Sequence, residues 1–450
     1  MKSTPNRIRF RSLLMGLALT AVLVPTAPLC AQTAQQLQQK VQQLEAELSR
    51  TRQQLQQEQA KAQQAQAELE QVQEKVGDAA ELPPDKIEIG PLKIGGAARV
   101  NYVIGDYAND DAPSRGGDGG NFELDTFRFN VDYECGNWIG KAEYRFYNGY
   151  NFLHTGWLGY NLPDESQVQV GVNRVPFGPG PYGISQSWFF DQHYYVGLSD
   201  DMDLGVKYTK PIDNLTLDLA YYFSDEGQWR GDSADSARYS YDVVDESDNG
   251  YEERHQVNAR AIYSFSDWSV PTDLGLSAQY GQLDSNGPQD DGDHYAGSVH
   301  MVNKWDNWTL ASQFTYYKYD IDPYDSFPGY VGNGGFATDE LINMGAYDFA
   351  WPVAAEAYIP GISLSYYHET PQVAWLDYVI PYVEYSNIIK AESAFNDSEM
   401  VTLGAAWARG GWYIYTDLVY SNGNYFVGDQ GYGDYTNADL VGDVGANRND

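Results

Sequence analysis

The sequence predicts an all-β transmembrane barrel of about 16 antiparallel strands, preceded by an N-terminal α-helical coiled coil. Three observations support this prediction. Apolar and polar side chains alternate over many segments of about ten residues, short and long links alternate between these segments, and a heptad pattern precedes them. A period of two places successive side chains on opposite faces of a strand. Tight turns at one end and long loops at the other are typical of an outer-membrane barrel.

Residues 127–147 show the alternation most clearly. Two sets of side chains interleave there, apolar Phe127, Phe129, Val131 and Tyr133 with polar Arg128, Asn130, Asp132 and Glu134. After the turn at residues 135–137 the pattern resumes. We expect the apolar set to face lipid and the polar set to line a lumen.

Fifteen such segments are predicted in the barrel domain, residues 92–450. They are 92–102, 121–134, 138–147, 152–162, 167–173, 202–210, 215–223, 254–265, 274–281, 294–303, 308–317, 362–369, 377–388, 399–409 and 412–421. Long loops are expected at 106–120, 174–201, 224–253, 282–293, 318–361 and 389–398, and only the link 148–151 breaks the pattern by being short.

A count of fifteen has a consequence for closure. Barrels of this kind close with an even number of strands, because an open edge cannot lie in lipid. We therefore expect one further strand, which makes 92–450 a barrel whose C-terminal strand is lacking. The alternative is that one strand has been divided wrongly.

The N-terminus resembles a secretory signal. Basic residues precede the apolar run 13–24, which is too short to span a membrane, and we expect cleavage after Ala31, so that the signal peptide is 1–31. Lipidation at Cys30 is the alternative. If Cys30 is removed with the signal, Cys135 is left without an intrachain partner.

Residues 32–82 are predicted to form a periplasmic coiled coil, followed by the linker 83–91. The heptad seam consists of Leu37, Val41, Leu44, Leu48, Thr51, Leu55, Glu58, Ala62, Ala65, Leu69, Val72 and Val76. Steps of 4 and 3 residues place these side chains on one stripe of a helix, which needs partner chains. The alternative is a single polar helix or a spacer.

Composition excludes several classes of protein. The formal net charge of −35 gives no basic footprint for nucleic acid. The six histidines show no metal-ligand spacing, and no Gly-x-Ser-x-Gly motif occurs. His193 near Asp191 is interpreted as a loop hydrogen bond and not as a catalytic pair. We expect no enzyme, no metal and no cofactor.

Charged side chains are unevenly distributed in the predicted barrel. Loop 224–253 contains ten acids against two arginines, so the mouth of the barrel is expected to be strongly acidic. Inward positions are mixed and slightly basic, and the predicted pore-lining residues are Lys93, Arg99, Arg128, Lys141, Glu143, Arg145, Arg174, Lys207 and Arg260. Two interpretations remain open. The bases form a track for anions, or lumen charges pair across strands while the acidic loops bind divalent cations.

Loop 174–201 is dense in proline, glycine and aromatic residues. We predict that it folds into the barrel as a constriction, because an exposed Trp-Phe-Phe segment would form a sticky patch. The predicted constriction residues are Pro176, Phe177, Tyr182, Trp188, Phe189 and Phe190. A surface protrusion is the alternative.

Two segments and the overall layout resemble the phosphate-selective porin O/P family, including its dicarboxylate-type relatives with an N-terminal coiled coil. The segments are Phe127–Val131 followed by Lys141–Tyr144, and Val170–Gly178. The resemblance implies a 16-stranded trimeric barrel with a constricting third loop, and uptake of phosphate or organic anions. Two departures leave the solute open. Residues 174–201 contain Arg174 but no lysine, and Arg145 stands where an acid is expected.

Together these patterns predict an outer-membrane porin of a Gram-negative bacterium, a homo-oligomer, a trimer by resemblance, that contacts lipid and lipopolysaccharide. Its water-filled channel would pass small hydrophilic solutes, among them anions such as phosphate or organic acids. The alternative is a structural anchor that tethers the envelope through its coiled coil.

Overall fold

The computed structural model describes residues 87–104, 121–246, 248–324, 338–393, 395–422 and 447–448, all within the unit Leu82–Asp450. The predicted signal peptide 1–31, the predicted coiled coil 32–82 and residues 83–86 of the predicted linker lie outside the described residues. In the described ranges, no helix has the length and apolar character needed to cross a membrane.

Fifteen long antiparallel strands form the main sheet of the described chain, one at each predicted position. They are β2 (Leu92–Val103), β3 (Asn121–Cys135), β4 (Trp138–Phe146), β5 (Asn151–Asn161), β6 (Gln167–Arg174), β7 (Met202–Ile212), β8 (Leu215–Asp225), β10 (Tyr251–Phe265), β11 (Thr272–Ser285), β12 (Gly292–Trp305), β13 (Trp308–Asp320), β16 (Glu356–Tyr366), β18 (Tyr378–Lys390), β20 (Ser398–Arg409) and β21 (Trp412–Asn422). Each pairs with the next along the chain, so the sheet is an antiparallel meander.

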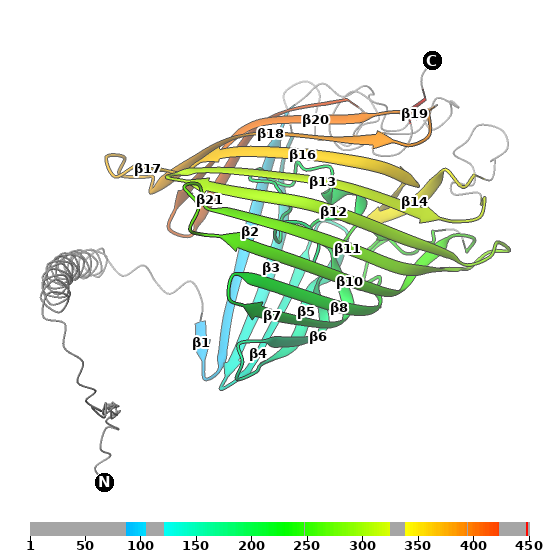
Figure 1. The fold of residues 1–450 in the computed structure, drawn as a ribbon, viewed down its shortest axis with the longest axis horizontal. Helices are drawn as coiled ribbons and strands as arrows, with labels where there is room; N and C mark the ends of the chain where they lie inside the picture. The colour runs from blue at the N-terminus through cyan, green and yellow to red at the C-terminus, as the bar shows by residue number, and fades with distance from the viewer. Residues whose placement is uncertain are drawn as a thin grey trace, which may run out of the picture. The chain divides into compact units, whose positions relative to one another are not determined.

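The meander curves around an interior (Figure 1). We call strands β2–β8 the first wall and strands β10–β20 the second wall, and we call the two ends of the strands the turn end and the loop end. Strands β2 and β21 begin and end the meander and are not paired with each other in the described residues. Strand β1 (Ile87–Ile89) pairs with the start of β2. Closure by a sixteenth strand stays a prediction.

Three predicted boundaries are wrong. Strand β16 begins at Glu356 and not at residue 362, and the long loop predicted at 282–293 shrinks to the link 286–291 because both flanking strands extend. The loop predicted at 318–361 contains β14 (Leu341–Ala346) and β15 (Phe349–Ala354), which form a small separate sheet with β9 (Asp242–Val243). Short elements also occur at β17 (His368–Glu369), β19 (Phe395–Asn396), β22 (Asn447–Arg448) and the 3-10 turn Tyr194–Val196.

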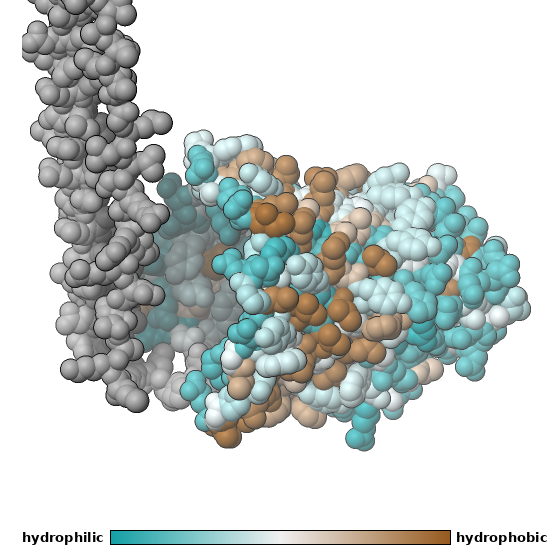
Figure 2. All heavy atoms as spheres, turned by 60° about the horizontal axis from the view of Figure 1, so that its bottom comes forward, coloured by the Kyte–Doolittle hydropathy of each residue, from teal (hydrophilic) through white to brown (hydrophobic). Residues whose placement is uncertain are grey.

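Side chains segregate between the two faces of the sheet. On β11, Leu274, Leu276 and Tyr280 are exposed, whereas the intervening Ser277 and Gln279 are buried. Figure 2 shows the resulting hydrophobic belt, in brown, across one outer face of the molecule. Hydrophilic side chains, in teal, gather at the right-hand end of that view. A water-soluble protein does not expose an apolar belt of this size and bury polar residues behind it.

Aromatic rings gather on the outer face near both ends of the strands. At the turn end the ring centroids of Trp138 and Tyr160 lie 5.0 Å apart, and those of Tyr367 and Tyr378 lie 4.9 Å apart. Towards the loop end the pairs are Tyr144–Phe146, Tyr221–Phe223 and Tyr316–Tyr358, at 5.0–5.1 Å. Rings in two belts of this kind are typical of the two interfaces of a membrane.

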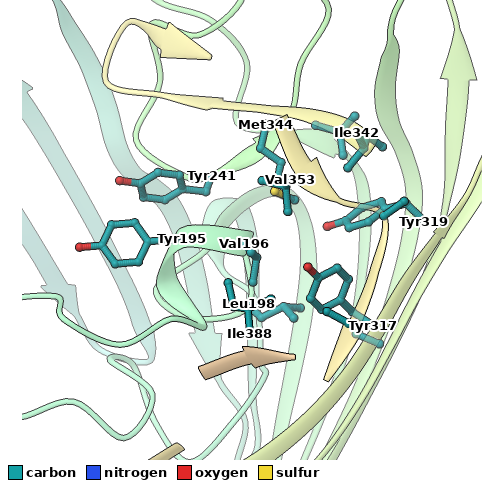
Figure 3. Packing of buried hydrophobic residues seen from close by; sticks show 14 of the residues in the cluster. Tyr195, Val196, Leu198, Tyr241, Tyr317, Tyr319, Ile342, Met344, Val353 and Ile388 are labelled. Carbon is teal, nitrogen blue, oxygen red and sulfur yellow. The ribbon is translucent and has the colours of Figure 1, made fainter. Parts of the chain in front are cut away.

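The interior at the loop end is packed with apolar side chains. Val196 and Leu198 of loop 175–201 and Ile342 of β14 form one buried cluster with Tyr317 and Tyr319 of β13 (Figure 3). The cause is that long loops fold inward and bring apolar side chains of their own. The alternation along the strands could not reveal these residues, because they lie between the strands.

Candidate functional site

The predicted pore-lining arginines of β2–β4, Arg99, Arg128 and Arg145, lie on the inner face near carboxylates. The Arg99 guanidinium bonds Asp125. On β4, Arg145 Nε donates to Glu143 Oε1 over 2.7 Å, and Arg128 Nη1 of β3 lies 3.7 Å from the same oxygen. These charges therefore pair across and along neighbouring strands, which favours the second of the two interpretations.

The bases further along the first wall and on β10 follow the same rule. Arg174 Nη2 lies 2.6 Å from Asp200 Oδ1, and Arg260 Nη2 lies 2.8 Å from Asp218 Oδ2. Lys207 Nζ donates instead to the carbonyl oxygen of Arg174 over 2.6 Å. Carboxylates thus compensate the charges of Arg174 and Arg260, as low-dielectric surroundings require, whereas Lys207 has a hydrogen-bond acceptor without a charge.

Exposure of inward side chains falls along β4 from the turn end to the loop end. Lys141 is exposed, whereas the Glu143 and Arg145 side chains retain 9% and 7%. Arg128 of β3, which pairs with Arg145 across the two strands, is the exception with a side chain that is 44% exposed. Lys93 and Glu134, 3.1 Å apart, lie exposed at the turn end. The interior is therefore open to water near the turns and narrows towards the loops.

Loop 175–201 causes much of this narrowing because it crosses from the first wall to the second. Near its start, Gly178 N donates to Ser277 Oγ on β11 over 3.1 Å. Further along, Gln192 N donates to Ser386 Oγ on β18 over 3.0 Å, and His193 Nε2 lies 3.0 Å from Thr315 Oγ1 on β13. The loop therefore lies inside the curved sheet.

Glu384 of β18 is the main anchor of this loop, and sequence reasoning missed it. Its carboxylate accepts hydrogen bonds from Ser185 Oγ, Ser187 N and Ser363 Oγ over 3.0–3.3 Å, and further bonds from Gln186 N and Ser187 Oγ. No local signal links a glutamate on β18 to a loop about 200 residues earlier.

The predicted constriction residues divide into two groups. Pro176 and Phe177 are buried near the start of the loop, and Phe189 and Phe190 are partly buried against the interior cluster. Trp188 and Tyr182 contact the basic side chains instead. Arg99 lies 4.9 Å from the Trp188 ring and Arg174 lies 5.4 Å from the Tyr182 ring, within the range of cation–π attraction.

His193 and Asp191 are joined by a hydrogen bond of 2.8 Å and both are buried. The pair holds the turn at Tyr194–Val196 against Thr315 of the second wall. This arrangement agrees with the interpretation as a loop hydrogen bond.

The acidic loop 224–253 differs from its predicted form. Asp225, Glu226 and Asp242 are buried, not solvated at a mouth. They surround Arg238, which is also buried and contacts Asp225, Asp235 and Asp242 at 2.6, 2.5 and 3.3 Å. Burial is the main influence raising the pKa of Asp235, to about 6, although the Arg238 guanidinium opposes that shift. A charge count cannot tell acids that turn inward from acids that face water.

The structural comparisons found outer-membrane proteins. The chain resembles the outer-membrane expressed OmpT of Vibrio cholerae (14% identity, 81% of this chain and 96% of that one, TM-score 0.45), the outer-membrane channel DcaP of Acinetobacter baumannii (11%, 74% and 92%, 0.45) and an anion-selective porin from Comamonas acidovorans (12%, 73% and 88%, 0.40). No protein-family model and no curated protein matches the chain. At these identities and TM-scores, the likeness establishes neither a shared family nor a shared function.

Proposed function

We propose that the protein is an outer-membrane porin whose interior passes small hydrophilic solutes by passive diffusion. One observation carries the proposal: apolar side chains cover the exposed outer face of the meander while charged side chains line its inner face. Lipid on one side and water on the other is the environment that requires this arrangement.

The position in the membrane is part of this proposal. The two aromatic belts would lie at the interfaces, and the aliphatic side chains between them, such as Leu276 and Val299, would meet the acyl chains. Placing the loop end at the cell surface and the turn end in the periplasm follows the usual threading of such barrels. The lipopolysaccharide contact and the homotrimer implied by the family resemblance belong to the same proposal.

The interior supports a weakly selective channel and not a dedicated phosphate site. Arg99, Arg174 and Arg260 each have a carboxylate partner, so their charges are largely neutralised by ion pairs within the wall. Arg128 and Lys141 are the bases most open to water. We therefore expect a small preference for anions, set by these two exposed side chains.

Conductance in planar lipid bilayers tests the proposal. Full-length protein, folded in detergent and added to one chamber, should give discrete current steps in potassium chloride. Heat-denatured protein from the same preparation is the control. Folded protein that inserts into liposomes but gives no current steps would remove the porin assignment.

A further inference from the structure

Six carboxylates meet inside the loop end, beside β7, β8 and β10. They come from the end of loop 175–201, from loop 224–253 and from the strands, and they are Asp201, Asp203, Asp225, Glu226, Asp242 and Glu253. Each is at most 7% exposed. Burying ionised carboxylates together is costly unless a positive charge or protons compensate them.

Among the described residues, Arg238 is the one base within this cluster, and it neutralises only some of the six carboxylates. Arg238 points towards Asp225, Asp235 and Asp242. Asp201 and Asp203 lie beyond the hydrogen-bonding reach of its guanidinium in the structure, and each has a buried oxygen, Oδ1, that accepts no hydrogen bond. Two acceptor atoms without donors in a buried acidic cluster indicate that something positive belongs between them.

The geometry of three of these acids suits a metal ion. One carboxylate oxygen each from Asp201, Asp203 and Asp242 lies within 4.8 Å of the others. Two ligands on opposite sides of a calcium ion are separated by about 4.6–5.2 Å. The Asp203 carboxylate is also held in place, because its Oδ2 accepts a hydrogen bond from Gln256 Nε2 over 2.9 Å.

We propose that Asp201, Asp203 and Asp242 bind a calcium ion that fastens loops 175–201 and 224–253 to the start of β7. An all-carboxylate donor set favours a hard cation over zinc or copper. Calcium fits a crowded site better than magnesium, which retains most of its water and demands a regular octahedron. This proposal goes beyond the proposed function and does not depend on whether the protein conducts.

The sequence analysis predicted no metal because Asp242 is distant in sequence from Asp201 and Asp203, and only the packing of two loops brings the three carboxylates together.

The test uses full-length protein stripped with EDTA and dialysed in detergent. Calcium chloride should raise its melting temperature by several degrees and saturate at one ion per chain, measured by equilibrium dialysis with elemental analysis. Asp201→Asn and Asp242→Asn should lower the calcium affinity at least about tenfold, because affinity follows the number of charged ligands. Asp232→Asn, an exposed acid of the same loop, is the matched control and should behave as wild type.

The direction in which Asp201→Asn changes the melting temperature, with and without calcium, distinguishes a metal site from a purely structural cluster. Without calcium, the Asp201→Asn variant should melt at or above the wild-type temperature, since it removes repulsion. With calcium the order should reverse. If a variant fails to fold, the wild-type protein is titrated with terbium instead. Terbium bound at the site should luminesce after excitation of nearby Tyr222, and added calcium should displace it. No calcium-dependent shift, an equal shift with magnesium, or a shift retained in both variants would overturn the proposal.

Discussion

The two walls of the interior differ in the partners of their inward polar side chains. Strands β2–β8 carry arginines and lysines, such as Arg99 and Arg145, that are matched by carboxylates. Strands β11–β20 carry mainly Ser, Thr and Gln side chains, with Glu384 as the acid that binds loop 175–201. The first wall therefore satisfies its own charges, whereas the second uses its polar groups to hold a loop.

We expect the largest effect from a charge on the outer face of the sheet, because that face is apolar whereas the inner faces of both walls are polar. Leu276→Lys places a charge in the middle of the exposed belt of β11 and should cost about 2–4 kcal/mol of unfolding free energy in a bilayer. Denaturant-induced unfolding from liposomes measures this cost. Gln282→Lys, on the same face and strand but nearer the loop end, should cost only about 0–1 kcal/mol. Equal costs at both sites would contradict a lipid-facing belt.

Removing the anchor of the second wall is expected to have the next largest effect. Glu384→Ala leaves the buried donors of Ser187 and Gln186 unsatisfied, each worth about 1–3 kcal/mol, so the loop should detach locally. Single-channel recordings should show larger mean conductance and more frequent current fluctuations. Glu399→Gln, an exposed acid on β20, is the control. Unchanged recordings from Glu384→Ala would show that the loop is held by other contacts.

Neutralising the water-exposed bases of the first wall should shift ion selectivity moderately. The double change Arg128→Gln and Lys141→Gln removes the two charges of the first wall that are most open to water in the interior. The reversal potential in a potassium chloride gradient should move towards cations by several millivolts. Arg145→Gln is a poor probe, because that guanidinium is already paired with Glu143. A shift towards anions would contradict the assigned wall.

Exposed loop acids should matter least. At physiological salt the screening length is about 8 Å, so charges at loop tips contribute little field inside the channel. Asp232→Asn combined with Asp248→Asn should change the reversal potential by less than the wall variant does. A larger shift than that of the wall variant would place the selectivity at the mouth.

Sequence patterns identified the strands well because their signal is local. A lipid-facing strand must alternate at every second residue, so each of the fifteen strands could be read from its own residues, as β3 and β4 illustrate. The exception is β16, which was predicted to begin at residue 362. Pro360 and Gly361 usually interrupt strands, but β16 continues through them from Glu356.

Contacts between distant segments could not be predicted in the same way. The hydrogen bond between Glu384 and Ser187 depends on the curvature of the whole sheet, and Glu384 was not singled out from the sequence. Asp225 and Asp242 looked like solvated loop acids, yet they pair with Arg238 in the interior. Burial of a loop is decided by what it packs against, and that information is spread over several strands.

The central claim is that neighbouring residues of one strand face lipid and interior in turn. Spin labels at each residue from Tyr295 to Met301 of β12, in a background with Cys30 and Cys135 replaced, test it in liposomes. Labels at Tyr295, Gly297, Val299 and Met301 should be accessible to oxygen dissolved in lipid and protected from aqueous nickel complexes. Labels at Ala296, Ser298 and His300 should lack that lipid signature. Uniform accessibility along the strand would contradict the account.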